Sequence, residues 1–318
     1  MVQPAHEDSS VPGGETLTRR GWLRRAGRWT RGVACLSLPA AGGLVACSDA
    51  ADRRHDGPDG PRAEPVRQPV RVAWVFSSGG PRGFVHVGVL QALAELGLKP
   101  DLIVGASAGA LAGSLFAAGW SGSALRERAL QLQPWQLGRL AWGTDERFSA
   151  LGLADWVNEQ LQGRGLHQLA VPVAVAAWNR SRAQLTAFTA GNAGLAVAAS
   201  CAIEGQFAPL RLGDDRFVDA DLHQPLPVRL ALSLGAQRVL AVDASAHEWK
   251  APAGTERWRE GDLRKRALTQ PDAQLADLLL HPDIGYYASI SRGYRERVID
   301  AGYQDTLRQG QALRALHA

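Results

Sequence analysis

Two stretches decide the fold: "VRVAWVFSSGGPRGFVHVGVLQALAELG" (70–97) and "PDLIVGASAGALAGSLFAAG" (100–119). Each begins with a short, nearly continuous apolar run, which is typical of a strand covered on both faces. A glycine-rich turn follows, and apolar residues then recur at helical spacing. Two successive strand–turn–helix units predict an α/β fold with a mainly parallel sheet and helices on both faces.

Later segments extend this pattern. The composition predicts strands at 171–179, 182–191 and 238–245, a helix at 192–203, and a short strand with a loop at 214–222. Residues 246–273 carry many charges and no clear periodicity, so we expect an irregular insertion there.

Length and charge limit the function. The chain has 318 residues, of which 46% are hydrophobic and 21% charged, as expected of one large globular domain. The sequence pI of about 9.2 would suggest an anionic partner. However, six Arg and only three acidic residues fall within residues 1–46, and the rest is nearly neutral. Because the chain after residue 46 has almost no net charge, we do not predict that it binds nucleic acid.

Residues 1–46 read as a signal peptide, because paired arginines precede a modest apolar stretch that ends in small residues. "TRRGWL" (18–23) resembles a twin-arginine export signal, and "LVAC" (44–47) resembles the lipobox of bacterial lipoproteins. The second resemblance implies that Cys47 is acylated and anchors the protein to a membrane of the cell envelope. The alternative is an ordinary cleaved signal followed by a chance cysteine.

Residues 47–69 then form a lipidated cysteine and a tether, since residues 48–69 are rich in Pro, Asp and Arg and nearly devoid of apolar side chains. Such a segment is expected to be disordered. The folded domain spans 70–318. Only Cys201 remains as a free thiol in the mature chain, so no internal disulfide is expected.

Ser107 lies at the centre of a G-x-S-x-G motif whose glycines are Gly105 and Gly109. In this motif the glycines allow a sharp strand-to-helix turn that exposes the serine at the amino end of the helix. Helix-end amides there stabilise negative charge that develops beside the hydroxyl. The other interpretation is structural, because Gly and Ser are common in turns and helix caps.

A second glycine cluster, "GGPRG" (79–83), ends the preceding strand and can direct backbone N–H groups at the same point. Pro81 has no N–H. The predicted oxyanion donors are therefore Gly79, Gly80, Arg82 and Gly83. The cluster lacks G-x-G-x-x-G spacing and no Gly-Lys-Ser/Thr follows it, so a nucleotide loop is not indicated.

The segment from Ser78 to Gly119 resembles the opening of the patatin-like phospholipases, and "AASCAIEGQFAPLRLGDDRFVDADLHQPLPV" (198–228) resembles their downstream block. The resemblance implies a three-layer α/β/α fold, a catalytic Ser107, and a catalytic Asp219 that forms a dyad without histidine. Three positions depart from the family pattern: Ser78 replaces the first loop glycine, Glu204 stands where proline is common, and Asp221 replaces a small residue.

The resemblance implies a serine acyl hydrolase that cleaves esters of phospholipids, lysophospholipids or related lipids. No metal-ligand motif is visible and dyad chemistry needs no metal, so neither metal nor cofactor is expected. Asp219 and Asp221 are two residues apart and point to one side of an extended segment, so the pattern alone does not choose the base. His223 is a candidate third member. The competing function is an exported lipid-binding or scaffold lipoprotein in which Asp-Ala-Asp has lost catalysis.

Overall fold

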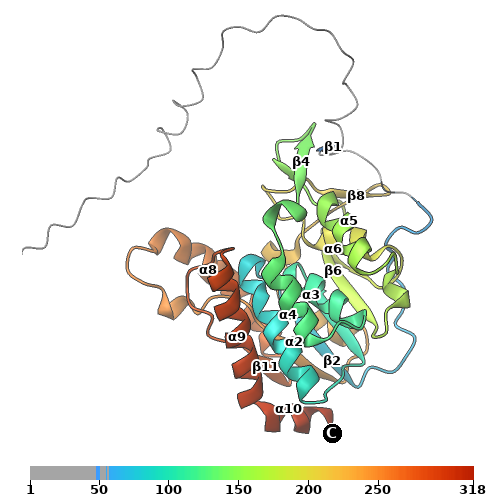
Figure 1. Ribbon diagram of the computed structural model, residues 1–318. Coiled ribbons are helices and arrows are strands. Elements are labelled where there is room, and N and C mark those ends of the chain that lie inside the picture. Colours follow the sequence, from blue (N-terminus) through green and yellow to red (C-terminus); the bar gives the residue numbers. More distant parts are fainter. Residues whose placement is uncertain (1–47, 51–54, 56) are drawn as a thin grey trace, which may run out of the picture. The chain divides into compact units, whose positions relative to one another are not determined.

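The computed structural model describes residues 48–50, 55 and 57–318. Its centre is an eight-stranded sheet in the order β11-β10-β2-β3-β6-β9-β8, with β7 also paired to β6 (Figure 1). The first part of this order, from β11 to β6, is parallel, and β7, β8 and β9 pair antiparallel. The predicted mainly parallel sheet is confirmed. The strands are β2 (Val72–Phe76), β3 (Leu102–Ala106), β6 (Val173–Asn179), β7 (Gln184–Phe188), β8 (Leu210–Leu212), β9 (Asp215–Val218), β10 (Arg238–Val242) and β11 (Leu278–Leu280).

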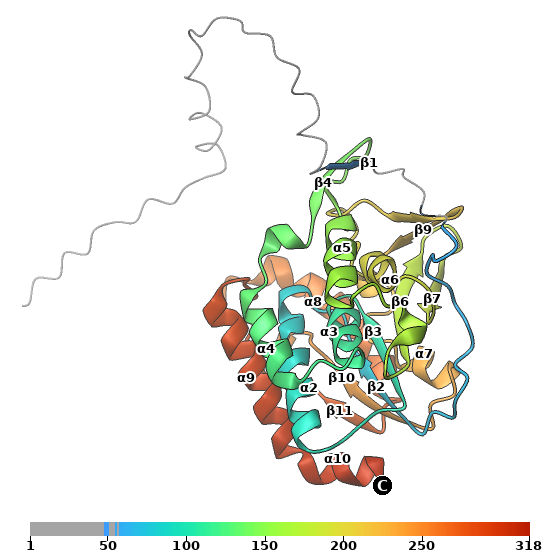
Figure 2. The same cartoon turned by 45° about the vertical axis from the view of Figure 1, so that its right-hand side comes forward.

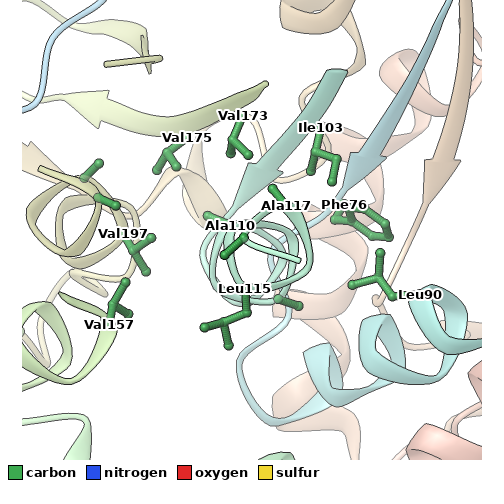
Figure 3. Packing of buried hydrophobic residues seen from close by; sticks show 14 of the residues in the cluster. Phe76, Leu90, Ile103, Ala110, Leu115, Ala117, Val157, Val173, Val175 and Val197 are labelled. Carbon is green, nitrogen blue, oxygen red and sulfur yellow. The ribbon is translucent and has the colours of Figure 1, made fainter. Parts of the chain in front are cut away.

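Helices cover both faces of the sheet, because neighbouring side chains along each buried strand point to opposite sides. Trp74 and Phe76 of β2 join a large core with the helices of one face, whereas Ala73 and Val75 pack towards α7 on the other. Figure 3 shows the first core, in which α3 packs on the strands that carry Ile103 and Val173 and lies beside α6, against which α5 packs. The three-layer prediction is therefore confirmed. The helices are α2 (Val85–Glu95), α3 (Ala108–Ala117), α4 (Gly122–Gln131), α5 (Leu151–Gln160), α6 (Ala193–Ser200), α7 (Val228–Ser233), α8 (Glu256–Ala273), α9 (Arg292–Arg308) and α10 (Gly310–His317).

The register of β2 and β3 positions the candidate site. Phe76, the last residue of β2, lies opposite Gly105, next to the end of β3. Since the strands are parallel, the turns that follow them meet at one edge of the sheet. The glycine loop and Ser107 are neighbours for this reason.

Helices α2 and α9 lie side by side (Figure 2) and approach closely through glycines. A Cβ built on Gly88 of α2 would lie 1.9 Å from the carbonyl oxygen of Ile299 in α9. A Cβ on Gly302 would lie 2.4 Å from the carbonyl oxygen of Val85. Backbone therefore packs on backbone at this crossing.

The expectation of an irregular segment at 246–273 is wrong for most of its length, because α8 occupies residues 256–273. The helix is polar along its length and contains Pro271, so its sequence shows no apolar periodicity that would predict a helix. Charge pairs at helical spacing, such as Arg264 with Glu260, support it instead.

The expectation of a disordered tether also fails for residues 57–66. Arg62 forms an antiparallel bridge with Ala190, and Glu64 exchanges two hydrogen bonds with the Thr189 hydroxyl. Val66 packs against the core beside α7. Backbone pairing with residues that follow β7 orders a segment that has few apolar side chains of its own.

A second, three-stranded sheet has the order β1-β4-β5 and consists of β1 (Ser48–Ala50), β4 (Arg139–Trp142) and β5 (Phe148–Ser149). The predicted signal peptide (1–46) and Cys47 lie outside the described residues. Within the described part of the chain, no helix is long and apolar enough to cross a membrane.

Gly88→Ala should destabilise the protein by about 3 kcal/mol, because the added methyl group must push α9 away from α2. Urea unfolding measures this. Gly261→Ala is the matched control, since Gly261 lies in α8 and a Cβ there meets nothing within 4 Å. This control should leave stability unchanged or raise it by up to about 1 kcal/mol. Equal effects of the two substitutions would contradict the close-packing argument.

Candidate active site

Ser107 occupies a strained turn between β3 and α3. Its φ of 53° and ψ of −121° place it in a region that non-glycine residues rarely adopt. A Cβ on Gly105 would lie 2.6 Å from the Ala110 nitrogen, and one on Gly109 would lie 2.4 Å from the Phe76 carbonyl oxygen. Both flanking glycines are therefore required by close backbone contacts.

The Ser107 hydroxyl does not cap the helix. Ser107 stands at the N-cap of α3, but its side chain accepts no capping hydrogen bond. Instead its backbone N–H donates to the Ser200 hydroxyl (2.7 Å), which in turn donates to the Ala176 carbonyl (2.6 Å). This chain fixes the turn and leaves the Ser107 hydroxyl for another partner. The structural interpretation of the motif, a serine needed only for the turn, does not account for this arrangement.

Asp219 is that partner. It follows β9, which pairs with β6 beside β3, so the sheet carries its carboxyl group to Ser107. The Ser107 hydroxyl lies close enough to the Asp219 carboxylate to lower the pKa of that carboxyl group. The carboxylate also accepts the backbone N–H of Asp221 at 2.9 Å. Asp219 is only 3% exposed.

The environment of Asp219 raises its pKa to about 7. Burial is the largest cause, because the charged form loses hydration, and the nearby negative charge of Asp221 adds to it. Hydrogen bonds from Ser107 and from the Asp221 backbone, together with the positive charge of Lys265, act in the opposite direction. The carboxyl group is consequently a much stronger base than an exposed aspartate.

Asp221 has different partners. Lys265 of α8 pairs with it at 2.5 Å, and the Ser78 hydroxyl donates to the same carboxylate oxygen. Lys265 also donates to the Ser78 hydroxyl at 3.3 Å. Burial raises the pKa of Asp221, but the Lys265 charge and these hydrogen bonds outweigh it, so the pKa is lowered.

Two of the departures from the family pattern thus occupy one cluster. Ser78, in place of a glycine, and Asp221, in place of a small residue, bind each other and Lys265. Sequence reasoning missed Lys265, since it lies 44 residues beyond Asp221 in a segment without a recognised motif.

The glycine loop packs directly on the turn that holds Ser107. A Cβ on Gly83 would lie 2.3 Å from the Ala108 Cβ, and Gly80 has a positive φ of 50°. Gly80 and Gly83 line a cavity together with Ser107. The Arg82 backbone N–H donates to the Gly79 carbonyl oxygen at 3.0 Å, so the predicted oxyanion donor Arg82 is used within the loop.

The Arg82 side chain ties the loop to the rest of the domain. Its guanidinium group donates to the Tyr286 carbonyl at 2.8 Å and lies 3.5 Å from the Asp262 carboxylate. These contacts order the loop from the side of α8.

The two histidines near the site have structural surroundings. His86 is fully buried with Nε2 2.8 Å from the Ser77 carbonyl, and burial lowers its pKa to about 4. His223 stacks on Trp178 with ring centroids 4.1 Å apart, and its Nε2 lies 3.4 Å from Glu204. The contacts of His223 thus point to Glu204 rather than to the dyad.

The cavity beside Ser107 has a volume of about 260 Å³. Its wall is mostly apolar and comes from α3, α4 and α5 and from the segment after α6. Arg128 and Arg295 are its charged members, and Arg295 donates to the Ala129 (2.9 Å) and Leu132 (2.6 Å) carbonyls. An apolar cavity that opens on a serine suits a hydrocarbon chain attached to an ester.

Among the described residues, no cluster of three or more His, Cys, Asp or Glu side chains could hold a metal ion. The site consists of the hydroxyl, two carboxylates, an ammonium group and backbone amides.

Comparison with known proteins identifies a family of similar sequences. The model of the family described as patatin-like phospholipase matches residues 74–232. The chain is 31% identical over 188 residues to patatin-like phospholipase domain-containing protein 7 of Mus musculus, covering 56% of this chain and 14% of that protein. It is 30% identical over 191 residues to an uncharacterized NTE family protein of Mycobacterium bovis, covering 56% and 50%. The chain thus spans half or less of these relatives.

The crystal structure of VipD from Legionella pneumophila is similar with a TM-score of 0.48 and 13% identity, covering 79% of this chain and 70% of that one.

The charges around Asp219 lead to a pKa prediction. Lys265→Gln should raise the pKa of Asp219 above about 7, because a stabilising positive charge is lost, and Asp221→Asn should lower it, because a repelling negative charge is lost. Carboxyl ¹³C NMR titration measures both. Lys265→Arg, which keeps the charge, is the control. An Asp219 pKa that is the same in all three variants would contradict this electrostatic account.

Proposed function

The chain belongs to the patatin-like phospholipase family, and we propose that it is a serine acyl hydrolase that cleaves ester bonds of phospholipids, lysophospholipids or related lipids. One observation carries the proposal. The Ser107 hydroxyl does not cap α3, lies beside a buried carboxylate whose pKa it lowers, and opens on an apolar cavity.

The proposed mechanism follows the proton. Ser107 Oγ attacks the ester carbonyl carbon while Asp219 accepts the hydroxyl proton. Asp219 then returns this proton to the leaving alcohol as the carbon–oxygen bond breaks. Water repeats the sequence on the acyl-enzyme and releases the fatty acid. Since Asp219 must be ionised to act as base, activity should fall as the pH drops below its pKa of about 7.

Negative charge develops on the carbonyl oxygen when Ser107 attacks the ester and again when water attacks the acyl-enzyme. Hydrogen-bond donors are needed to stabilise this charge in both reactions. Gly80 and Gly83 line the cavity beside Ser107, and we assign the oxyanion site to backbone amides of this loop. The amino end of α3, which starts at Ala108, adds its dipole. Each such donor typically contributes a few kcal/mol to transition-state stabilisation.

The competing function, a lipid-binding protein without catalysis, rested on the second aspartate of Asp-Ala-Asp. Asp221 binds Lys265 and Ser78, while the Asp219 carboxylate lies beside the Ser107 hydroxyl, which lowers its pKa. The additional aspartate therefore leaves the proposed dyad intact, which favours the enzyme.

We also propose that Cys47 is acylated and that the protein is exported to the cell envelope as a lipoprotein. The support is the sequence "LVAC" after a twin-arginine-like and apolar segment.

Ser107→Ala and Asp219→Asn should each lower ester hydrolysis by about a thousandfold or more, because one removes the nucleophile and the other the proton acceptor. Asp221→Asn and His223→Gln should keep a substantial fraction of the activity. Hydrolysis of a short soluble ester and labelling by a fluorophosphonate probe measure these effects, with urea unfolding as the check on the fold. A dead Asp221→Asn beside an active Asp219→Asn would reassign the base, and a dead but folded His223→Gln would indicate a triad.

Cys47→Ala should abolish incorporation of a labelled fatty acid in cells, since the acylated thiol is gone, and should leave hydrolysis of soluble esters nearly unchanged. Cys201→Ala serves as the control for labelling, because burial raises the pKa of the Cys201 thiol and keeps it unreactive. Lipid labelling that persists in Cys47→Ala would overturn the lipoprotein proposal.

A further inference from the structure

An exposed apolar surface lies on the β4–β5 hairpin. We call Leu140, Trp142 and Phe148 the hairpin patch; they are 59%, 59% and 37% exposed. Leu140 and Trp142 are two residues apart on β4 and share a face, and Leu140 lies directly opposite Phe148 on β5. Just before the hairpin, Trp135 adds a fourth large apolar side chain, 75% exposed. Contiguous exposed apolar side chains of this size mark an interaction surface.

The hairpin patch continues the wall of the cavity. The Phe148 ring lies 5.8 Å from the ring of Phe207, which lines the cavity beside Ser107. Backbone hydrogen bonds hold the two segments together: Phe148 N–H donates to Gln206 (3.1 Å) and Ala208 N–H donates to Phe148 (2.7 Å). An apolar path therefore runs from Trp142 and Leu140 through the two phenylalanines to the candidate nucleophile.

The start of the described chain lies on the same hairpin. β1 pairs parallel with β4, so that Ser48 lies opposite Leu140 and Ala50 opposite Trp142 (Figure 2). The chain reaches β1 one residue after Cys47. A lipid anchor on Cys47 would accordingly be bonded to the residue that precedes Ser48, and Ser48 pairs with Leu140.

We propose that the hairpin patch inserts into the surface of a phospholipid bilayer and delivers lipid from it to the cavity. This inference rests on the proposed function, because a cavity for lipid acyl chains must be filled from a surface that contains them. Tryptophan together with leucine and phenylalanine suits the boundary between headgroups and acyl chains.

The charges of the hairpin indicate which kind of bilayer it fits. Arg139 and Arg147 are balanced by Asp145 and Glu146, so the hairpin segment 139–148 has no net charge. Binding is therefore driven by apolar insertion and needs no anionic headgroups.

The test measures partitioning of the full chain carrying Cys47→Ala, so that acylation cannot hold it on membranes. The probe is vesicles of phosphatidylcholine, whose lack of net charge avoids attraction to the arginines of residues 1–46. In this background, Leu140→Thr with Trp142→Thr should weaken partitioning by about tenfold or more. Threonine preserves the preference for a strand. Leu275→Thr is the control, since Leu275 is 47% exposed and lies between α8 and β11, outside the hairpin.

Hydrolysis of a short soluble ester should be equal in the parent, the double variant and the control, because neither hairpin residue lines the cavity. Equal vesicle partitioning of parent and double variant would overturn the proposal. The proposal would also be overturned if the parent did not bind vesicles but formed a dimer that the double variant cannot form, since the hairpin patch would then bind a second copy of the chain. A parent that partitions normally but hydrolyses no ester would instead refute the proposed function and leave vesicle binding by the patch established.

Discussion

Ser107 reaches its position because two turns pack against each other with no side chain between them. A Cβ on Gly83 would collide with Ala108, and a Cβ on Gly109 would collide with the carbonyl of Phe76. The parallel register of β2 and β3 brings these turns to one edge, and the glycines let them close. Everything else at the site depends on this contact, since it fixes both the strained backbone of Ser107 and the glycine loop that lines the cavity beside it.

The local part of this architecture is predictable from the sequence. The two strand–turn–helix units, the positions of Gly105 and Gly109, and the parallel sheet all follow from spacing within about 50 residues. The partner carboxylate is harder to predict, because an extended segment would place Asp219 and Asp221 on one side. The fold instead forms the 3-10 helix η5 after Asp219 and gives the two carboxylates different partners.

Lys265 illustrates what pattern reasoning misses. It sits on a polar helix whose stability comes from charge pairs and tertiary contacts rather than from an apolar stripe. Its role becomes visible only when α8 is folded against η5 (Ala220–Leu222). Residues 57–66 likewise depend on contacts with residues that are distant in the sequence. They have few apolar side chains, and backbone pairing with the segment after β7 orders them instead.

Asp219 must be ionised to act as the proposed base, yet its burial disfavours the ionised form. A pKa of about 7 instead of 3.8 corresponds to a penalty on the order of 4 kcal/mol for the ionised carboxylate. This penalty is fully present above pH 7 and is relieved as the pH falls towards 3.8, so it lowers stability in the pH range in which Asp219 could serve as the proposed base. A second carboxylate beside Asp219 would make ionisation still harder. The Lys265 ammonium group pairs with Asp221 and stabilises both charges, which offsets part of the repulsion that Asp221 exerts on the Asp219 carboxylate.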